Sequence, residues 1–284
     1  MSIVVTGATG HLGRHVVEQL LEKVPADQVV AVVRSPEKAA DLAERGVRIA
    51  VADYNAPETF EGLFSAGDKV LLISGNEFDK GRVRQHRAVI DAARAAGVAL
   101  LAYTSAPGPL KAALADDHRG TEEALLASGV PYVLLRNGWY HENYTEQLAP
   151  VLEHGAVVHA AGEGRISSAS RAEYAAAAVA VLTGEGHENR TYELGGDEAW
   201  SLAEYAAELS RQTGRTITSN PVTVEEFAGV LAGAGLPGPI AAILAGVDAS
   251  IEKGELVVTS GDLSRLIGRP TSPVSEAISA ALED

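Results

Sequence analysis

The chain has no cysteine among its 284 residues, which excludes disulfide bonds, thiolate nucleophiles and iron–sulfur ligation. Aromatic residues make up only 5% of the sequence, and no apolar run approaches the roughly 20 residues that a membrane-spanning helix needs. Basic residues are in the minority, with 23 Lys and Arg against 38 Asp and Glu. The resulting net charge of −15 argues against nucleic acid or an anionic membrane surface as a main partner. Any redox chemistry has to come from a bound cofactor.

The overall composition is that of a globular protein. With 46% hydrophobic and 21% charged residues, the chain can bury a large core as one or two domains. It enters a strand directly, without a signal sequence, so we expect a cytoplasmic protein. The sequence leaves the oligomeric state open, and a homo-oligomer is compatible with it.

The most informative stretch is a glycine-rich turn that follows the apolar residues 3–5. It reads Thr-Gly-Ala-Thr-Gly-His-Leu-Gly over residues 6–13, and apolar residues at helical spacing follow it. Glycines let phosphate oxygens approach the backbone, and the N-terminus of a helix favours an anion. We therefore expect a cradle for a dinucleotide pyrophosphate. The alternative is an ordinary strand-to-helix turn that binds nothing.

The second expected strand, residues 29–33, ends at Arg34, where an NAD-binding protein would carry an acidic residue for the ribose. A guanidinium at this place can bind a 2′-phosphate through two hydrogen bonds, and Ser35 and Lys38 add a donor and a positive charge. The sequence therefore favours NADP(H) over NAD(H). The alternative is a surface arginine at the end of a strand.

Strands and helices alternate over the first half of the chain. Further strands are expected at 47–51, 69–73, 98–103 and 132–135, with helices such as 83–96 between them. Because these strands are apolar on both faces, we expect an α/β fold with a doubly wound parallel sheet of the Rossmann type. Ligands bind outside the carboxyl ends of such strands. The residues at these ends are Arg34, Asp53, Ser74, Thr104, Ser105, Arg136 and Asn137.

Beyond about residue 143 the pattern changes, and helices dominate. They are expected at 144–153, 171–182, 202–211, 224–232 and 272–282, with short strands at 191–194 and 216–218. We therefore expect residues 1–142 to form an NADP-binding domain and residues 143–284 a smaller, mixed, mostly helical lobe that binds the substrate. A later segment could still return to the sheet.

Several segments together resemble the NmrA-like atypical short-chain dehydrogenases, in particular the bacterial NAD(P)H:quinone oxidoreductase 2 type. The resemblance covers essentially the whole chain and includes the glycine turn, Arg34 and residues 169–175 and 266–270. Its most specific part is Leu-Arg-Asn-Gly-Trp-Tyr-x-Glu-Asn-Tyr over residues 135–144. The resemblance implies an NADPH-dependent reductase that passes hydride directly to a quinone-like planar acceptor, without a flavin.

The resemblance also implies roles for individual residues. The pyrophosphate would be held by Gly7, Thr9, Gly10, His11, Leu12 and Gly13, and the 2′-phosphate by Arg34 and Lys38. The adenosine side would be lined by Asp53, Tyr54, Ser74 and Gly75. The nicotinamide and the acceptor would be surrounded by Thr104, Ser105, Asn137, Gly138, Trp139 and Tyr140. Asn143 and Tyr144, in the same segment, are further candidates for contact with the substrate.

No conventional acid–base pair is evident. None of the eight tyrosines is followed by Lys four residues on, the pair that moves a proton in alcohol-acting members of this class. This disfavours a sugar-nucleotide or alcohol-converting enzyme. His118 stands four residues before Glu122, where related reductases carry a lysine, so it is a candidate to orient the ribose or donate a proton. The alternative is a solvated histidine beside Asp116 and Asp117.

A quinone tolerates a missing acid because it delocalises the charge it receives, so positioning does most of the catalysis. The side chains of Asn137, Asn143 and Tyr140 could donate hydrogen bonds to the developing oxyanion. The candidate catalytic residues are therefore Asn137, Tyr140 and His118. Trp139 and Tyr140 could stack on a flat ring, or pack in a core where two domains join.

The main alternative to a reductase is an NADP-sensing regulator without turnover, because it would need the same cradle and no catalytic acid. We expect no metal site. His11 and His15 have the spacing of a zinc pair, but Leu12 stands where a metalloprotease carries Glu, and no third ligand is evident. The acidic pairs at 116–117 and 122–123 are expected on a solvated face.

Overall fold

The computed structural model describes residues 1–75 and 81–283, and the chain divides into two compact units. Unit 1 comprises Met1–Ala106, Asp117–Asn137 and Arg171–Tyr192. Unit 2 comprises Pro107–Asp116, Gly138–Ser170 and Glu193–Asp284. The two units interleave along the chain, so unit 1 also includes residues beyond the expected domain boundary at residue 142.

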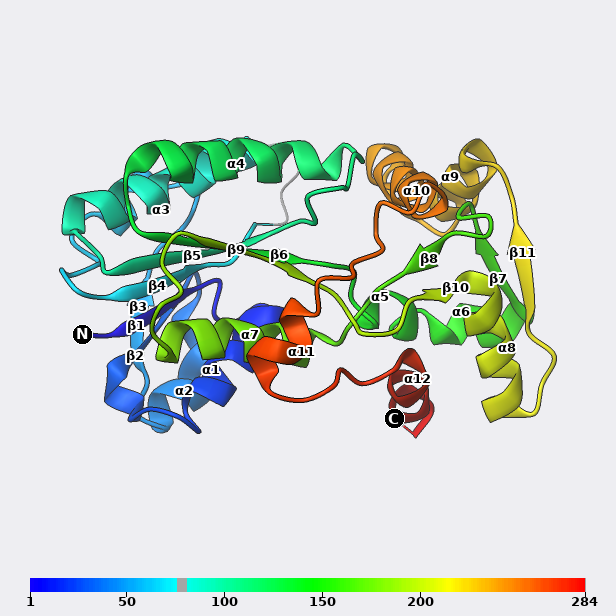
Figure 1. The fold of residues 1–284 in the computed structure, drawn as a ribbon, viewed down its shortest axis with the longest axis horizontal. Helices are drawn as coiled ribbons and strands as arrows, with labels where there is room; N and C mark the ends of the chain where they lie inside the picture. The colour runs from blue at the N-terminus through cyan, green and yellow to red at the C-terminus, as the bar shows by residue number, and fades with distance from the viewer. Residues whose placement is uncertain (76–80, 284) are drawn as a thin grey trace. The chain divides into compact units, whose positions relative to one another are not determined.

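A seven-stranded sheet with the order β3-β2-β1-β4-β5-β6-β9 forms the central layer of unit 1 (Figure 1). Its strands are β1 (Ile3–Thr6), β2 (Val29–Val33), β3 (Arg48–Val51), β4 (Lys69–Leu72), β5 (Leu100–Ser105), β6 (Tyr132–Asn137) and β9 (Arg190–Leu194). Neighbouring strands from β3 to β6 pair in parallel. The chain builds outward from β1 to β3 and then crosses to β4 on the other side of β1. The strand order therefore reverses between β1 and β4, and in open α/β sheets the ligand crevice lies at the carboxyl ends of the strands at such a point.

Helices cover both faces of this sheet. They are α1 (His11–Leu20), α2 (Ala40–Glu44), α3 (Arg82–Ala96), α4 (Leu114–Ser128) and α7 (Arg171–Thr183), with short 3-10 turns at η1 (Ala26–Gln28), η2 (Pro36–Ala39) and η3 (Pro57–Phe60). Figure 1 shows α3 and α4 on one face and α1, α2 and α7 on the other. The predicted doubly wound parallel sheet is confirmed.

The core of unit 1 follows from the apolar strands. Every residue of β2 is buried, so this strand has apolar neighbours on both sides. One core cluster joins Val4, Val70 and Leu101 of the sheet to Val89 and Ile90 of α3. The helix expected over residues 83–96 is thus α3, and Val89 and Ile90 lie on its buried face.

Unit 2 is mixed and mostly helical, as predicted. Its helices are α5 (Glu142–Thr145), α6 (Leu148–His154), α8 (Leu202–Thr213), α9 (Val224–Gly233), α10 (Gly238–Glu252), α11 (Asp262–Ile267) and α12 (Val274–Glu283). Two small sheets pair β7 (Ala156–His159) with β11 (Thr218–Pro221), and β8 (Arg165–Ile166) with β10 (Trp200–Ser201). Ser201 and Thr223 begin α8 and α9, each in a capping box with a glutamate three residues on.

Some expected boundaries in unit 2 were wrong. The helix expected at 144–153 is two short helices, and the strand expected at 216–218 starts only at Thr218. Strands β7, β8 and β10 were missed because two to four residues carry almost no periodic signal. Helix α10 was missed because its first residues, Gly238 and Pro239, are typical of a loop. Among the described helices, none is long and apolar enough to cross a membrane.

Candidate cofactor and substrate residues

The glycine turn brings the end of β1 very close to the first turn of α1. Gly7 has a φ of 63°, in the left-handed region that favours glycine. A Cβ atom on Gly13 would lie 2.3 Å from the carbonyl oxygen of Gly7 and 2.9 Å from Cα of Ala8. A Cβ atom on Gly10 would lie 3.2 Å from the same oxygen. The backbone therefore adopts a shape that only glycine fits at residue 13.

This turn presents the N-terminus of α1 to the crevice side of the sheet. Gly10 is the N-cap and has no side chain to cap the helix, and the first turn carries no acidic residue. The first backbone N–H groups of a helix have no partner within it and favour an anion. His11 is exposed here and Thr9 is half-buried, whereas Leu12 is buried. The geometry fits a phosphate group.

Positive charge gathers at the end of β2. Arg34 directly follows this strand and is exposed, and its charge acts on the hydroxyl of Tyr54. Lys38 is exposed in η2. Its carbonyl oxygen accepts a hydrogen bond from Arg14 Nη2 at 2.9 Å, and Arg14 Nη1 also contacts Asp41 Oδ2 at 2.5 Å. Arg14 was missed as a residue near this site, although its position in α1, just after the glycines, signals a cation there.

Side chains from three elements hold the segment that continues β4. Three consecutive backbone N–H groups donate to them: Ile73 to Thr6 Oγ1 (3.1 Å), Ser74 to Thr104 Oγ1 (2.9 Å) and Gly75 to His86 Nε2 (3.0 Å). The acceptors lie on β1, β5 and α3 respectively. The expected residues Ser74, Gly75 and Thr104 are thus brought together in unit 1. His86 was missed, because nothing in its local pattern separates it from a core histidine.

Tyr54 connects this segment to β1. Its hydroxyl donates to the carbonyl oxygen of Ile73 at 2.7 Å and lies 2.5 Å from Thr6 Oγ1. Burial raises the pKa of this hydroxyl above its ordinary value, so it stays protonated. The neighbouring Asp53 is half-buried, and its carboxylate accepts the N–H of Asn55 at 2.9 Å. Both residues lie in unit 1, just beyond the end of β3.

The ends of β5 and β6 carry Ser105 and Asn137, and both residues are buried. The hydroxyl of Ser105 donates to Glu122 Oε1 at 2.6 Å, and the same carboxylate pairs with Arg136. Glu122 is only 7% exposed. The expectation that it belongs to a solvated acidic face was therefore wrong, because α4 turns this carboxylate toward the sheet.

His118 is buried and lies between Arg82 and Tyr103. Arg82 Nη2 lies 3.1 Å from His118 Nε2, and the Tyr103 hydroxyl lies 2.8 Å from Nδ1. Because a guanidinium can only donate, Nε2 must accept and the proton sits on Nδ1. Burial, reinforced by the charge of Arg82, holds the pKa of His118 well below its ordinary value. The alternative of a solvated histidine was wrong, because α4 packs this side chain inward.

In unit 2, a network of hydrogen bonds fixes the Trp-Tyr segment. Tyr140 pairs with Ala169, whose N–H donates to the carbonyl oxygen of Trp139 at 3.2 Å. The next residue, His141, contacts Ser168 Oγ through Nδ1 at 2.8 Å and the Ser272 carbonyl oxygen through Nε2 at 3.1 Å. Trp139 and Tyr140 are both half-buried.

Tyr144 belongs to an aromatic cluster in unit 2. Its ring meets Trp200 edge-on, with 5.0 Å between centroids, and lies 5.7 Å from Tyr205. Burial of the hydroxyl and the nearby Asp248 carboxyl raise the pKa of Tyr144 well above its ordinary value. Asn143, also half-buried, lies beside it in α5. Tyr144 is therefore a poor proton donor at neutral pH.

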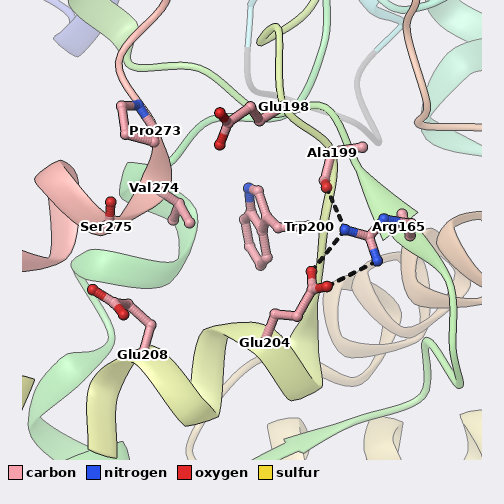
Figure 2. Close-up of a pocket in the computed structure, with 9 residues that line it drawn as sticks. All are labelled: Arg165, Glu198, Ala199, Trp200, Glu204, Glu208, Pro273, Val274 and Ser275. Atoms are coloured by element: carbon pink, nitrogen blue, oxygen red, sulfur yellow. Dashed lines mark hydrogen bonds and ion pairs between the residues drawn. The ribbon is translucent and has the colours of Figure 1, made fainter. Parts of the chain in front are cut away.

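A cavity of about 340 Å³ lies in unit 2 (Figure 2). Its lining comprises Arg165, Glu198, Ala199, Trp200, Glu204, Glu208, Pro273, Val274 and Ser275. Figure 2 shows Arg165 held by the Glu204 carboxylate and the Ala199 carbonyl, with Nη2 2.8 Å from Glu204 Oε2. Three carboxylates against one guanidinium make this cavity unsuited to a pyrophosphate. None of the sequence-predicted site residues lines it.

Across the described residues, no three His, Asp or Glu side chains are grouped so that they could hold a metal ion.

Comparison with known proteins agrees with the geometry of the glycine turn. Residues 7–185 match the model of a family described as NAD(P)H-binding. The chain is 47% identical over 281 residues to quinone oxidoreductase 2 of Escherichia coli, covering 98% of this chain and 97% of that protein. The solved structure of Escherichia coli QOR2 with NADPH matches with a TM-score of 0.95 and 46% identity over 99% of both chains. Citrobacter sp. triphenylmethane reductase with NADP(H) matches with a TM-score of 0.94 and 43% identity, over 99% of this chain and 100% of that one.

Proposed function

Because this chain belongs to the NAD(P)H-binding family, we propose that it is an NADPH-dependent reductase that transfers hydride directly to a quinone-like planar acceptor, without a flavin. The observation that carries this proposal is the likeness, along nearly the whole chain, to quinone oxidoreductase 2 of Escherichia coli. The relatives described above are named as oxidoreductases, which favours turnover over an NADP sensor. We expect the enzyme to act in the cytoplasm on a small-molecule acceptor.

The glycine turn supports the cofactor part of the proposal. The space that a Cβ of Gly13 would need is already filled by backbone, so this glycine lets α1 start close to β1. Residues proposed to hold the pyrophosphate are Gly7, Thr9, Gly10, His11, Leu12 and Gly13, through backbone N–H groups. Arg34 and Lys38 would bind the 2′-phosphate. When bound, the reduced nicotinamide supplies the hydride.

The remaining cofactor contacts come from the ends of the central strands. Asp53 and Tyr54 would flank the adenine, and Ser74 and Gly75 would line the adenosine side. Thr104, Ser105 and Asn137 would line the nicotinamide side. The fixed hydrogen bonds of residues 73–75 support this assignment, since a binding surface must be held in one shape before the ligand arrives.

For the acceptor, we propose contacts from the Asn-Gly-Trp-Tyr segment. The rings of Trp139 and Tyr140 would stack on a planar acceptor, and the amides of Asn137 and Asn143 with the Tyr140 hydroxyl would donate to the developing oxyanion. Water can protonate the hydroquinone anion after transfer, so no side-chain acid is needed. Both ring nitrogens of His118 already have buried hydrogen-bond partners, Arg82 and Tyr103, so His118 has no ring nitrogen left for the acceptor. We therefore assign it a positioning role, through its hydrogen bond to Tyr103.

Consumption of NADPH by the purified protein with 1,4-benzoquinone tests the proposal. We expect NADPH absorbance to fall in proportion to enzyme, with one hydroquinone formed per NADPH, and no stimulation by added flavin. Calorimetry with NADPH is run on the same sample. Binding of NADPH without consumption above background would overturn the reductase and favour the sensor, whereas no binding of either nicotinamide coenzyme would overturn the cofactor assignment as well.

A further inference from the structure

We propose that His86 is a positioning residue for the cofactor: its imidazole fixes the Gly75 backbone and thereby shapes the segment 73–75 on which NADPH binds. This inference rests on the proposed function and deepens it. His86 is fully buried in α3, with 0% of its surface exposed, so it acts through Gly75 and not by touching a ligand. Family membership does not assign any role to this residue.

The segment that His86 holds borders the crevice between β1 and β4. A Cβ atom on Gly7 would lie 3.6 Å from Cβ of Ile73, so residues 73–75 run beside the glycine turn. This segment lies beyond the last residue of β4, Leu72. Its backbone N–H groups therefore bond to side chains instead of a neighbouring strand. The conformation at this edge of the crevice depends on those side chains.

The partners of His86 determine which ring nitrogen carries the proton. The Gly75 N–H donates to Nε2 at 3.0 Å, so Nε2 must be unprotonated. The Thr121 hydroxyl donates to the Asp117 carbonyl oxygen at 2.8 Å, so its oxygen accepts from His86 Nδ1 at 2.9 Å. The imidazole is therefore neutral, with its proton on Nδ1. Helix α4 thus selects the tautomer that binds Gly75.

The surroundings of the ring keep it neutral. The rings of Tyr103 and Tyr54 meet it edge-on, with centroids 5.3 Å and 6.0 Å away. Burial, with the nearby charge of Arg82, lowers the pKa of His86 to about 3. A protonated imidazole would place an N–H against the N–H of Gly75, so burial preserves the one state in which this bond forms.

His86 also acts on the same segment through a second contact. The Tyr54 ring packs against it, and the Tyr54 hydroxyl donates to the Ile73 carbonyl oxygen at 2.7 Å. The imidazole of His86 therefore binds the Gly75 N–H directly. It also packs against Tyr54, whose hydroxyl binds the Ile73 carbonyl oxygen. Loss of the ring would release the Gly75 end of the segment and remove a packing contact of Tyr54, whereas the Ile73 N–H stays bonded to Thr6.

Two substitutions at this position separate hydrogen bonding from packing. His86→Leu removes the acceptor, and His86→Gln keeps an acceptor near the place of Nε2. We expect the Kd and KM for NADPH to rise about tenfold in His86→Leu, with kcat little changed, because one hydrogen bond that orders the site is lost. His86→Gln should recover most of the affinity. Thr121→Val, which removes the acceptor that selects the tautomer, should give an intermediate loss.

A matched control comes from unit 2. His159 is also buried, at 3% exposure, and its Nδ1 also accepts a backbone N–H, that of Ala161 at 3.2 Å. His159→Leu should lower thermal stability without changing the Kd for NADPH. Calorimetry on each folded variant gives the affinity independently of turnover. Nitrogen-15 spectra of the wild-type imidazole should show the proton on Nδ1 from mildly acidic to mildly alkaline pH.

The outcomes are distinguishable. A folded His86→Leu protein that binds NADPH as tightly as the wild type would overturn the positioning role and leave the proposed function intact. His86→Gln binding no better than His86→Leu would also overturn it, because the acceptor would then not matter. If His86→Leu does not fold, Thr121→Val decides, because wild-type affinity for NADPH in that variant would overturn the positioning role. A wild-type protein that binds no NADPH would overturn this inference together with the cofactor assignment.

Discussion

The carboxylate of Glu122 holds the guanidinium of Arg136 through two hydrogen bonds, Nε to Oε1 at 2.9 Å and Nη2 to Oε2 at 2.7 Å. Glu122 lies on α4 and Arg136 near the end of β6. The same carboxylate accepts the hydroxyl of Ser105 on β5 at 2.6 Å. One acidic side chain therefore fixes the ends of two strands that carry candidate nicotinamide contacts.

Glu122→Gln should lower the free energy of unfolding by about 1–2 kcal/mol, because a two-point charged pair loses its negative partner. We expect this loss of stability to be smaller than the loss on breaking a fully buried ion pair, since the Arg136 side chain is 26% exposed and partly screened by solvent. Urea unfolding measures the difference. Glu123→Gln changes an exposed neighbour and should stay within about 0.5 kcal/mol of the wild type. Equal losses in the two variants would contradict the structural role.

Gly13→Ala should disturb both the fold and the cofactor site. The added Cβ would lie 2.3 Å from the Gly7 carbonyl oxygen, so α1 has to move away from the turn. We expect a loss of about 1–3 kcal/mol of stability and a weaker affinity for NADPH. The control is Gly229→Ala in α9, where a Cβ meets nothing within 4 Å and alanine favours the helix. Wild-type affinity in Gly13→Ala would mean that the turn does not bind phosphate.

Arg34→Ala should weaken NADPH binding by about tenfold or more and leave NADH binding unchanged, because only NADPH carries the 2′-phosphate. Arg34→Asp should reduce the preference for NADPH over NADH further. Calorimetric titration with both coenzymes measures the effect, and Arg45→Ala removes another exposed arginine as the control. Unchanged discrimination between the coenzymes would show that Arg34 is only a surface residue.

Asp248 should make stability depend on pH. Its carboxylate accepts the Ala160 N–H at 2.8 Å, and burial raises its pKa from 3.8 to about 6. The folded protein thus holds this proton more tightly than the unfolded chain, so this contribution to stability decreases as the pH rises between these values. Asp248→Asn removes the buried charge. It should therefore raise the free energy of unfolding by about 2 kcal/mol above about pH 7 and change it hardly at all below about pH 4. Denaturant unfolding at both pH values measures this, with exposed Asp91→Asn as the control.

His118→Gln should leave the shape of the pH profile for kcat unchanged. The pKa of His118 lies well below its ordinary value, so the imidazole is already neutral throughout the neutral range. We expect a decrease in kcat of less than about tenfold, through loss of the contact with Tyr103. Disappearance of an ionisation from the profile would instead identify His118 as the proton donor.

The local patterns that were predicted correctly are those in which neighbouring residues decide the structure. The glycine turn after residues 3–5 and the strand over residues 29–33 were identified because backbone freedom and apolar runs act over short distances. The placement of Arg34 just after a strand followed from the same reasoning. Short strands such as β8 and β10 escaped because their pairing depends on a distant partner.

Side-chain partners that are far apart in the sequence could not be predicted. His86 and Thr121 are 35 residues apart, and the crossover from α3 through β5 to α4 brings them together. Their pairing leaves no periodic signal, because each residue is a single polar position inside a buried helix face. Glu122 looked like half of a solvated acidic pair for the same reason.

The sequence by itself determined the α/β class, the glycine turn and the cation at the end of β2, because each depends on residues adjacent in the chain. Only the tertiary structure decided which buried polar groups meet: His86 with Gly75, Glu122 with Arg136, and His118 with Arg82. The physical reason is that a buried polar group needs a partner, and that partner is chosen by how helices pack on the sheet.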